Sequence, residues 1–269
     1  MENGDYKLSM EDFRENLRRM EVPQEIRPLN KAEFKEFRGI TGQISWLASR
    51  TRPDIMINAL EMSYLSRCAT TQDARQANKI VDSVHKDKKV EILFSRIGDV
   101  KNLKIMAHSD ASHATQENKV KGVAGRIIYM SDLEETRVNP IDWKSKTIAQ
   151  VCKSVKSAET RSFEACAEIA VDISRRMFQL YFNKLGRFPV HMKTDSKGLQ
   201  DTLHSTRQVE EKEVILIVEK IKQMMARRDI EDPEWVESKK CHADMFTKKG
   251  SKFCADKVMN ILQTGKFLP

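Results

Sequence analysis

The chain has 269 residues, of which 40% are hydrophobic and 32% are charged, and its formal net charge is +8. This composition is typical of a soluble globular protein with room for one large or two modest domains. No stretch approaches the roughly 18 consecutive apolar residues of a membrane span, so no membrane partner is expected. The basic balance favours anionic partners, of which nucleic acid is the commonest.

The cysteines and the N-terminal segment bear on where the protein works. Five cysteines are scattered along the chain without a CxxC pair, which indicates a reducing compartment. The segment MENGDYKLSMEDF is acidic and polar, unlike a signal peptide, so we do not expect a secreted protein. Cys241, His242 and Cys254 lie close in sequence, but their spacing matches no zinc pattern. We expect them to be ordinary residues of a helix face.

The first third of the chain is predicted to be mostly helical. Residues 1–30 carry many charges with weak periodicity, and we expect a loosely ordered arm. From Lys31, apolar residues recur every three or four positions, which predicts an amphipathic helix that ends before Pro53. The further elements expected here are a helix over 54–67, a helix opened by a capping box of Thr70 and Asp73, and a short strand over 89–94.

After Gly98 the pattern changes to short β-like runs followed by alternating helices and strands. Three strands in succession indicate an antiparallel meander, and the later alternation indicates parallel strands added to it. We therefore predict a mixed five-stranded α/β sheet with flanking helices over 99–265, preceded by a helical region over 31–98. The predicted strands are 103–109, 122–130, 141–146, 189–194 and 234–237, and the predicted helices are 158–184, 197–204, 208–228 and 243–263.

Four carboxylates are expected at the ends of these elements. Asp110 and Asp195 each follow a predicted strand, and Asp244 lies near the start of the last helix. Glu159 lies four residues before Phe163, which places it on the inward apolar face of the long helix. Each residue alone has an ordinary explanation, because aspartates are common in turns and acidic residues are common at helix N-termini.

Together the four carboxylates point to a metal site, because the ends of strands and helices can meet at one edge of an α/β sheet. Divalent cations would relieve the repulsion among the carboxylates there, and carboxylate oxygens suit Mg²⁺ or Mn²⁺. Two such ions about 4 Å apart can activate a water molecule and stabilise the leaving oxygen in phosphodiester hydrolysis.

The chain contains a set of short motifs in a fixed order: Ser109-Asp110-Ala111, Trp143-Lys144-Ser145-Lys146, Ser157-Ala158-Glu159, the strand-end Asp195, and Ala243-Asp244-Met245-Phe246-Thr247-Lys248. As a set they resemble the C-terminal region of the Pol polyprotein of copia-type long-terminal-repeat retrotransposons, in which the tail of reverse transcriptase precedes a ribonuclease H domain. Upstream, residues 37–42 and 51–55 are similar to the segment that joins the polymerase to ribonuclease H. The similarity runs from about residue 31 to residue 250.

The resemblance implies a ribonuclease H-like fold and hydrolysis of the RNA strand of an RNA–DNA hybrid with two Mg²⁺ or Mn²⁺ ions. It also implies a partner in the polymerase part of a reverse transcriptase. The residues implied as catalytic and metal-binding are Asp110, Glu159, Asp195 and Asp244. The candidates for contacts with nucleic acid are Ser109, Ser112, Lys144, Lys146 and Lys248, and His242 is a candidate auxiliary residue for proton transfer or product release.

Two alternatives stay open, because Ala111-Ser112-His113 replaces the acidic residue and tryptophan that follow the first aspartate in the family. One is a domain that has lost catalysis and binds nucleic acid. The other is a structural role, in which residues 31–95 form a helical platform for a polymerase. For all three interpretations the expected location is a retrotransposon particle in the cytoplasm, or the nucleus.

Overall fold

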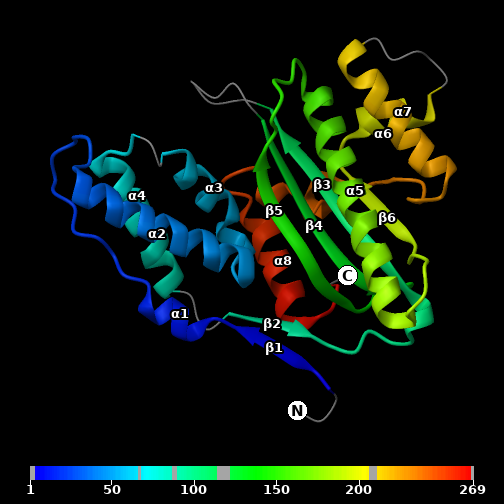
Figure 1. Ribbon diagram of the computed structural model, residues 1–269, viewed down its shortest axis with the longest axis horizontal. Helices are drawn as coiled ribbons and strands as arrows, with labels where there is room; N and C mark the ends of the chain where they lie inside the picture. The colour runs from blue at the N-terminus through cyan, green and yellow to red at the C-terminus, as the bar shows by residue number, and fades with distance from the viewer. Residues whose placement is uncertain (1–3, 66–67, 87–89, 114–121, 206–210, 268–269) are drawn as a thin grey trace. The chain divides into compact units, whose positions relative to one another are not determined.

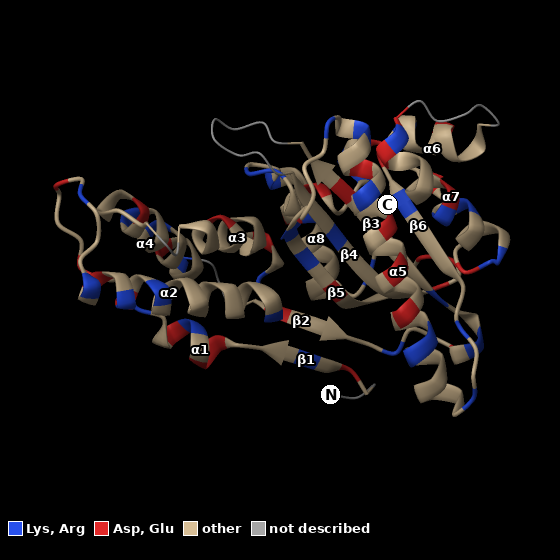
Figure 2. Cartoon of the chain, turned by 45° about the horizontal axis from the view of Figure 1, so that its top comes forward, with Lys and Arg blue, Asp and Glu red and all other residues tan. Residues whose placement is uncertain are grey.

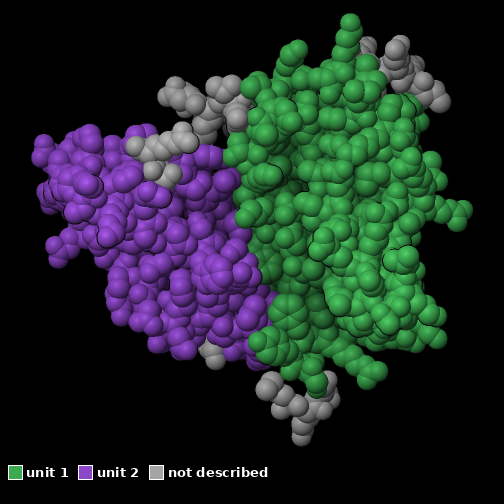
Figure 3. Space-filling view, in the orientation of Figure 1, with its two compact units in different colours: residues 1–6, 93–269 green, residues 7–92 purple. Residues whose placement is uncertain are grey.

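The computed structural model describes residues 4–65, 68–86, 90–113, 122–205 and 211–267 (Figure 1). The chain forms two compact units, which Figure 3 draws in separate colours: residues 7–92, and residues 1–6 with 93–269. No helix within the described residues is both long and apolar enough to cross a membrane.

The smaller unit is helical, as predicted. Its helices are α1 (Glu11–Asn16), α2 (Lys31–Arg50), α3 (Met56–Tyr64) and α4 (Thr71–Lys86), with a 3₁₀ turn η1 (Pro53–Ile55) before α3. α2 ends ahead of Pro53 as expected, and Asn30 with Glu33 forms a capping box at its start. The predicted capping box at α4 is confirmed, since the backbone N–H of Thr70 donates to the Asp73 carboxylate at 2.7 Å.

Residues 4–30, the described part of the predicted loose arm over 1–30, contain regular structure. They contain α1 and the strand β1 (Tyr6–Ser9), which pairs with β2 (Glu91–Phe94) in a two-stranded sheet. Leu17 and Met20 are buried. The backbone N–H of Met20 donates to the Asn78 side chain at 3.1 Å, and the Asn78 amide donates to the Met20 carbonyl at 2.9 Å. These two hydrogen bonds satisfy the buried backbone N–H and carbonyl groups of Met20. The sequence around Met20 has no periodic apolar pattern, so it did not predict this ordered segment.

The larger unit contains the predicted five-stranded mixed sheet, in the order β5-β4-β3-β6-β7. The first three strands form an antiparallel meander, and the last two add parallel to β3. This order and these directions are those of the ribonuclease H-like fold, so the predicted fold class is confirmed. The strands are β3 (Leu103–Ser112), β4 (Val123–Asp132), β5 (Val138–Thr147), β6 (Val190–Thr194) and β7 (Glu234–Trp235).

The long helix α5 (Val155–Phe182) packs along β3 and β4 (Figure 1). Phe163 is fully buried in a core shared with Ile105 and Ile128 of the sheet. The Ser154 side chain caps the helix start, and Asn183 ends it in the left-handed conformation. Two further helices, α6 (Lys197–His204) and α7 (Lys212–Ala226), pack beside α5. Residues 208–210 of the predicted helix over 208–228 lie outside the described residues.

The predicted last helix over 243–263 is wrong in its first part. Asp244–Phe246 forms a 3₁₀ turn, η4, and the helix α8 runs from Lys252 to Thr264. Gly250 separates them with a φ of +86°, a left-handed conformation that interrupts an α-helix and that glycine adopts without strain.

Candidate active site

Three of the four predicted carboxylates converge. One oxygen from each of Asp110, Glu159 and Asp195 lies within 4.8 Å of the others. The sheet topology brings the two aspartates together, because Ser109 of β3 is in register with Thr194 of the parallel strand β6 and each aspartate is the next residue. The carboxyl ends of neighbouring parallel strands thus carry one acid each.

Glu159 reaches the same place from the start of α5. The helix is tied to the end of β3 at this point, because the Ser162 hydroxyl donates to the Asp110 carbonyl at 2.7 Å. Glu159 is only 8% exposed and Asp110 only 1%. The predicted inward placement of Glu159 is therefore confirmed, and the two side chains share a nearly dry pocket of carboxylate oxygens.

Burial and mutual repulsion disfavour the charged forms of these acids. Burial raises the pKa of Glu159 to about 9, and the charges of Asp110 and Asp195 act in the same direction. Burial also raises the pKa of Asp110 to about 7, against the opposing effects of Lys248 and of the Thr247 hydrogen bond. In the absence of a cation, the site therefore retains protons at neutral pH.

Asp244 does not join the three converging carboxylates. Its side chain accepts short hydrogen bonds from Lys248 and Ser251, while the Lys248 ammonium lies 3.9 Å from the Asp110 carboxylate. Thr247 donates a short hydrogen bond to the same Asp110 oxygen. Asp244 is therefore linked to the site through the basic and hydroxyl side chains of its own segment.

Lys248 supplies positive charge next to the acids. Partial burial lowers the pKa of its ammonium, but the charge of Asp110 and the contact with Asp244 outweigh this effect and raise the pKa above its ordinary value. The side chain therefore stays charged and serves as an internal counter-ion for two carboxylates. It was predicted to contact nucleic acid, and its side chain remains 49% exposed.

Gly125 of β4 is a functional position that the sequence did not reveal. It is the register partner of Asp110. A Cβ built at Gly125 would lie 2.7 Å from a Thr247 side-chain carbon and 2.9 Å from the Ala243 carbonyl oxygen, both closer than normal contacts. The glycine thus lets η4 approach the sheet and bring Thr247 to Asp110. Ser145 of β5, the register partner of Gly125, also holds η4 by donating to the Phe246 carbonyl at 2.6 Å.

Gly125→Ala is expected to lower the free energy of unfolding by about 1–3 kcal/mol, because the added methyl group overpacks this contact. It should also displace Thr247 and thereby reduce any metal-dependent activity. Thermal denaturation and divalent-ion titration would measure both effects. The matched control is Gly42→Ala in α2, where the new methyl group meets nothing within 4 Å and a gain of about 0.5–1 kcal/mol is expected. Equal stability changes in the two variants would contradict the packing role of Gly125.

The other residues predicted to contact nucleic acid differ in their exposure to solvent. Lys144 and Lys146 are exposed on β5, and Ser112 is partly exposed at the end of β3; Figure 2 draws the basic residues of the chain in blue. Ser109 is only 1% exposed. Its side chain is enclosed because β3 is covered on both faces, so it does not offer a surface to nucleic acid.

His242 belongs to the core rather than to the rim of the site. It is 4% exposed, and its ring stacks on His108 with a centroid separation of 4.3 Å. The Tyr129 hydroxyl lies 3.3 Å from its Nδ1. Burial lowers the pKa of His242 to about 3, so the ring is neutral and its position does not favour the predicted proton transfer. Cys241 and Cys254 are buried free thiols. Cys254 lies in α8, whereas Cys241 lies outside a helix, so the expected helix-face position is wrong for Cys241.

The residues present fit a divalent cation. Three hard oxygen donors come within 4.8 Å of one another, two of them in a dry environment that raises their pKa. A bound cation would favour the ionised carboxylates and offset the free-energy cost of burying their negative charge. Carboxylate oxygens without cysteine or histidine ligands suit Mg²⁺ or Mn²⁺ rather than zinc.

Several solved structures are similar to part of the chain at low sequence identity. No family model and no curated protein matches the chain. Among solved structures, the N-terminal RNase H domain of Rv2228c from Mycobacterium tuberculosis, fused to maltose binding protein, matches with 15% identity and a TM-score of 0.41 over 58% of this chain and 99% of that chain. RNase H1 from the halophilic archaeon Halobacterium salinarum NRC-1 matches with 13% identity and a TM-score of 0.39 over 52% and 90%.

LC11-RNase H1 in complex with an RNA/DNA hybrid matches with 18% identity and a TM-score of 0.38 over 54% of this chain and 94% of that chain. Similarity at this level of identity and TM-score supports no statement about the fold or the activity of this chain. The strand order, the strand directions and the long helix on the sheet give the larger unit a ribonuclease H-like fold.

Proposed function

We propose that the larger unit is a metal-dependent endoribonuclease that hydrolyses the RNA strand of RNA–DNA hybrids. The observation that carries this proposal is the convergence of Asp110, Glu159 and Asp195 at the carboxyl edge of β3 and β6. A buried set of three acids is costly without a counter-charge, and a ribonuclease H-like sheet with a metal-binding set at this edge suits phosphodiester hydrolysis.

Each part of the chain has a distinct task in this proposal. Asp110, Glu159 and Asp195 would hold one or two Mg²⁺ or Mn²⁺ ions, and Asp244 would join them or position Lys248. Bound ions would supply the charge that activates water and stabilises the leaving oxygen. Thr247 and Lys248 fix the orientation and charge of Asp110. The hybrid would be recognised through its backbone and 2′-hydroxyl groups rather than through its sequence.

Cleavage of an end-labelled RNA–DNA hybrid in the presence of Mg²⁺ tests the proposal directly. Internal cuts in the RNA strand, and none in a DNA duplex of the same sequence, are expected. Absence of cleavage over the full range of Mg²⁺ and Mn²⁺ concentrations would contradict it.

Lys144 and Lys146 are proposed to contact phosphates, because they are exposed on β5 of the same unit. We expect Lys144→Gln and Lys146→Gln each to weaken binding to hybrids of any sequence. Each should also reduce the slope of log affinity against log salt by about 1. Fluorescence anisotropy at several salt concentrations measures the slope. Lys35→Gln, at an exposed position of α2, is the control, and an unchanged slope in both β5 variants would remove these lysines from the interface.

A second candidate is a nucleic-acid-binding module without catalysis. Lys248 favours it, since a lysine beside Asp110 already neutralises part of the charge that a cation would otherwise balance. Salt-sensitive binding of the hybrid without cleavage would support this candidate over the enzyme.

The wider context of the chain is also a proposal. The motifs around Asp110, Glu159 and Asp244 support an origin in the C-terminal region of a copia-type Pol polyprotein, with the polymerase part of reverse transcriptase as a partner and residues 31–95 as a platform for it. A retrotransposon particle in the cytoplasm, or the nucleus, is the proposed location. Co-purification with a separately expressed polymerase segment would test the partnership.

A further inference from the structure

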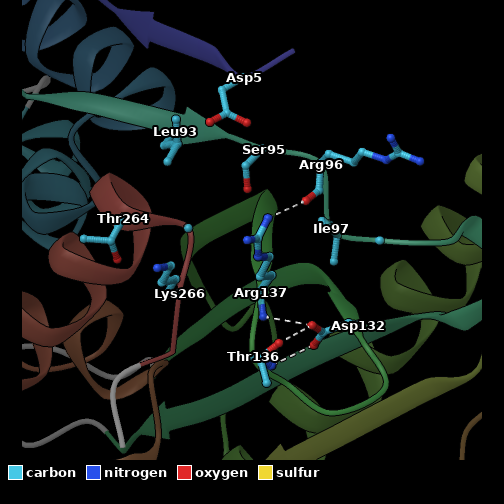
Figure 4. Close-up of a pocket in the computed structure, with 12 residues that line it drawn as sticks. Asp5, Leu93, Ser95, Arg96, Ile97, Asp132, Thr136, Arg137, Thr264 and Lys266 are labelled. Carbon is cyan, nitrogen blue, oxygen red and sulfur yellow. Dashed lines mark hydrogen bonds between the residues drawn. The ribbon is translucent and has the colours of Figure 1, made fainter. Parts of the chain in front are cut away.

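A cavity of about 560 Å³ lies at the end of the β4–β5 hairpin in the larger unit (Figure 4). Its volume is in the range of small-molecule sites in proteins. The lining combines basic, hydroxyl and apolar side chains, among them Arg137, Lys266, Ser95, Leu93, Ile97 and Asp5.

The cavity is separate from the carboxylate site. Asp132, which lines it, is the register partner of Leu103 at the start of β3. Asp110 lies seven residues further along that strand, which corresponds to about 23 Å at the usual rise per residue. A ligand in this cavity would therefore lie at the opposite end of the sheet from the proposed site of hydrolysis.

Two positively charged side chains, Arg137 and Lys266, are cross-strand neighbours in one wall of the cavity. Arg137 and Lys266 form an antiparallel bridge, fixed by the hydrogen bond from the Val138 N–H to the Gly265 carbonyl at 3.0 Å. Directly opposed like charges destabilise a pair of strands. Neither side chain has a carboxylate partner among the described residues, and the Arg137 guanidinium donates only to the Arg96 carbonyl, at 3.2 Å. Within the described residues, no ion pair therefore balances these two charges.

Asp132, the acid of this hairpin loop that lines the cavity, does not pair with either cation. The Asp132 carboxylate accepts from the backbone N–H groups of Thr136 at 2.7 Å and Arg137 at 3.1 Å, and from the Thr136 hydroxyl. These bonds stabilise the hairpin loop, and they occupy the Asp132 carboxylate with donors of the loop rather than with Arg137 or Lys266 side chains. Figure 4 shows the Arg137 and Lys266 side chains extending into the cavity, with the Asp5 carboxylate near the strand β1.

We propose that this cavity binds a phosphate monoester of mononucleotide size. A guanidinium and an ammonium on one wall provide charge-assisted donors for a phosphate dianion, and the planar guanidinium can donate two parallel bonds. Leu93 and Ile97 provide an apolar wall for a base, and the Asp5 carboxylate can accept from sugar hydroxyls. The site is made of side chains rather than of a glycine-rich loop.

Isothermal titration with adenosine monophosphate, inorganic phosphate and adenosine, in buffer with EDTA, tests the proposal. We expect the monophosphate to bind, inorganic phosphate to bind more weakly, and adenosine to give no heat at millimolar concentration. Arg137→Gln and Lys266→Gln should each weaken binding of the monophosphate roughly tenfold or more. Lys184→Gln, at an exposed position of the same unit, and Asp110→Asn should leave it unchanged.

Thermal denaturation adds a readout that a merely structural role would not give. In phosphate-free buffer, Lys266→Gln should melt at or above the temperature of the unmodified chain, because the opposed charges are relieved. Adenosine monophosphate should raise the melting temperature of the unmodified chain and not that of the variant. Binding of adenosine as tight as that of the monophosphate, full affinity in both charge variants, or no binding of the monophosphate would each overturn the proposal.

Discussion

Asp110→Asn and Glu159→Gln are each expected to reduce hybrid cleavage by at least about 10³-fold, which corresponds to about 4 kcal/mol of transition-state stabilisation. Each substitution keeps the shape of the side chain and removes a charged oxygen that would hold the cation. Both residues are buried and share one cluster with Asp195, so neither loss can be replaced by water. Cleavage rates of a labelled hybrid at saturating Mg²⁺ measure the effect.

The matched control for Glu159 is Glu164→Gln on the same helix. Glu164 pairs with Lys220 at 2.7 Å, away from the acidic cluster, and its substitution should leave the cleavage rate unchanged. The cluster variants should remain folded, since a neutral amide is easier to bury than a carboxylate. A large fall in melting temperature in Glu159→Gln would mark the residue as structural, and undiminished cleavage would remove it from the site.

The stability of the metal-free protein is expected to fall as the pH rises from about 5 to 9. The folded state raises the pKa of Asp110 to about 7 and that of Glu159 to about 9, whereas the unfolded chain has ordinary values near 4. Between these limits the folded state binds more protons than the unfolded state, so the free energy of unfolding decreases with pH. The stabilising contribution of protonated Asp110 and Glu159 is fully present below their pKa values in the unfolded chain. It is lost as the pH rises through their pKa values in the folded chain.

Melting temperatures in EDTA at pH 5, 7 and 9 test this dependence. Glu159→Gln should flatten the slope, because it removes the group with the higher pKa. Mg²⁺ should raise the melting temperature more at pH 9 than at pH 5, since a cation binds the ionised carboxylates. Identical slopes in the variant and the unmodified chain would show that the burial of Glu159 does not control its protonation.

The sequence was sufficient for the sheet and for three of the acids. Asp195 directly follows β6, whereas Asp110 lies within the last residues of β3, which extends to Ser112 beyond the predicted end at 109. Both could still be placed, because parallel pairing of β3 with β6 brings these ends together. Glu159 could be placed because its spacing from Phe163 puts both on the inward stripe of α5. These assignments rest on periodicity, which is a local property.

The parts that the sequence did not reveal depend on contacts between distant segments. The closeness of Gly125 to Thr247 follows from how η4 rests on β4, and no local pattern encodes it. Ser109 was a candidate for nucleic-acid contact because it adjoins Asp110. However, β3 is buried at nearly every position, so its sequence shows no alternation of apolar and polar residues that would separate a buried face from an exposed one. Asp244 was expected at a helix start, and the left-handed Gly250 places it in a separate turn.

The cysteines of the two units differ in their accessibility to thiol reagents. Cys68, in the smaller unit, is exposed, whereas Cys152, Cys166, Cys241 and Cys254, in the larger unit, are buried. Burial raises the pKa of Cys166 to about 12 and that of Cys254 to about 11, which suppresses their reaction with alkylating reagents. A maleimide thus marks the helical unit in the native chain, and labelling of the other four thiols reports opening of the sheet domain.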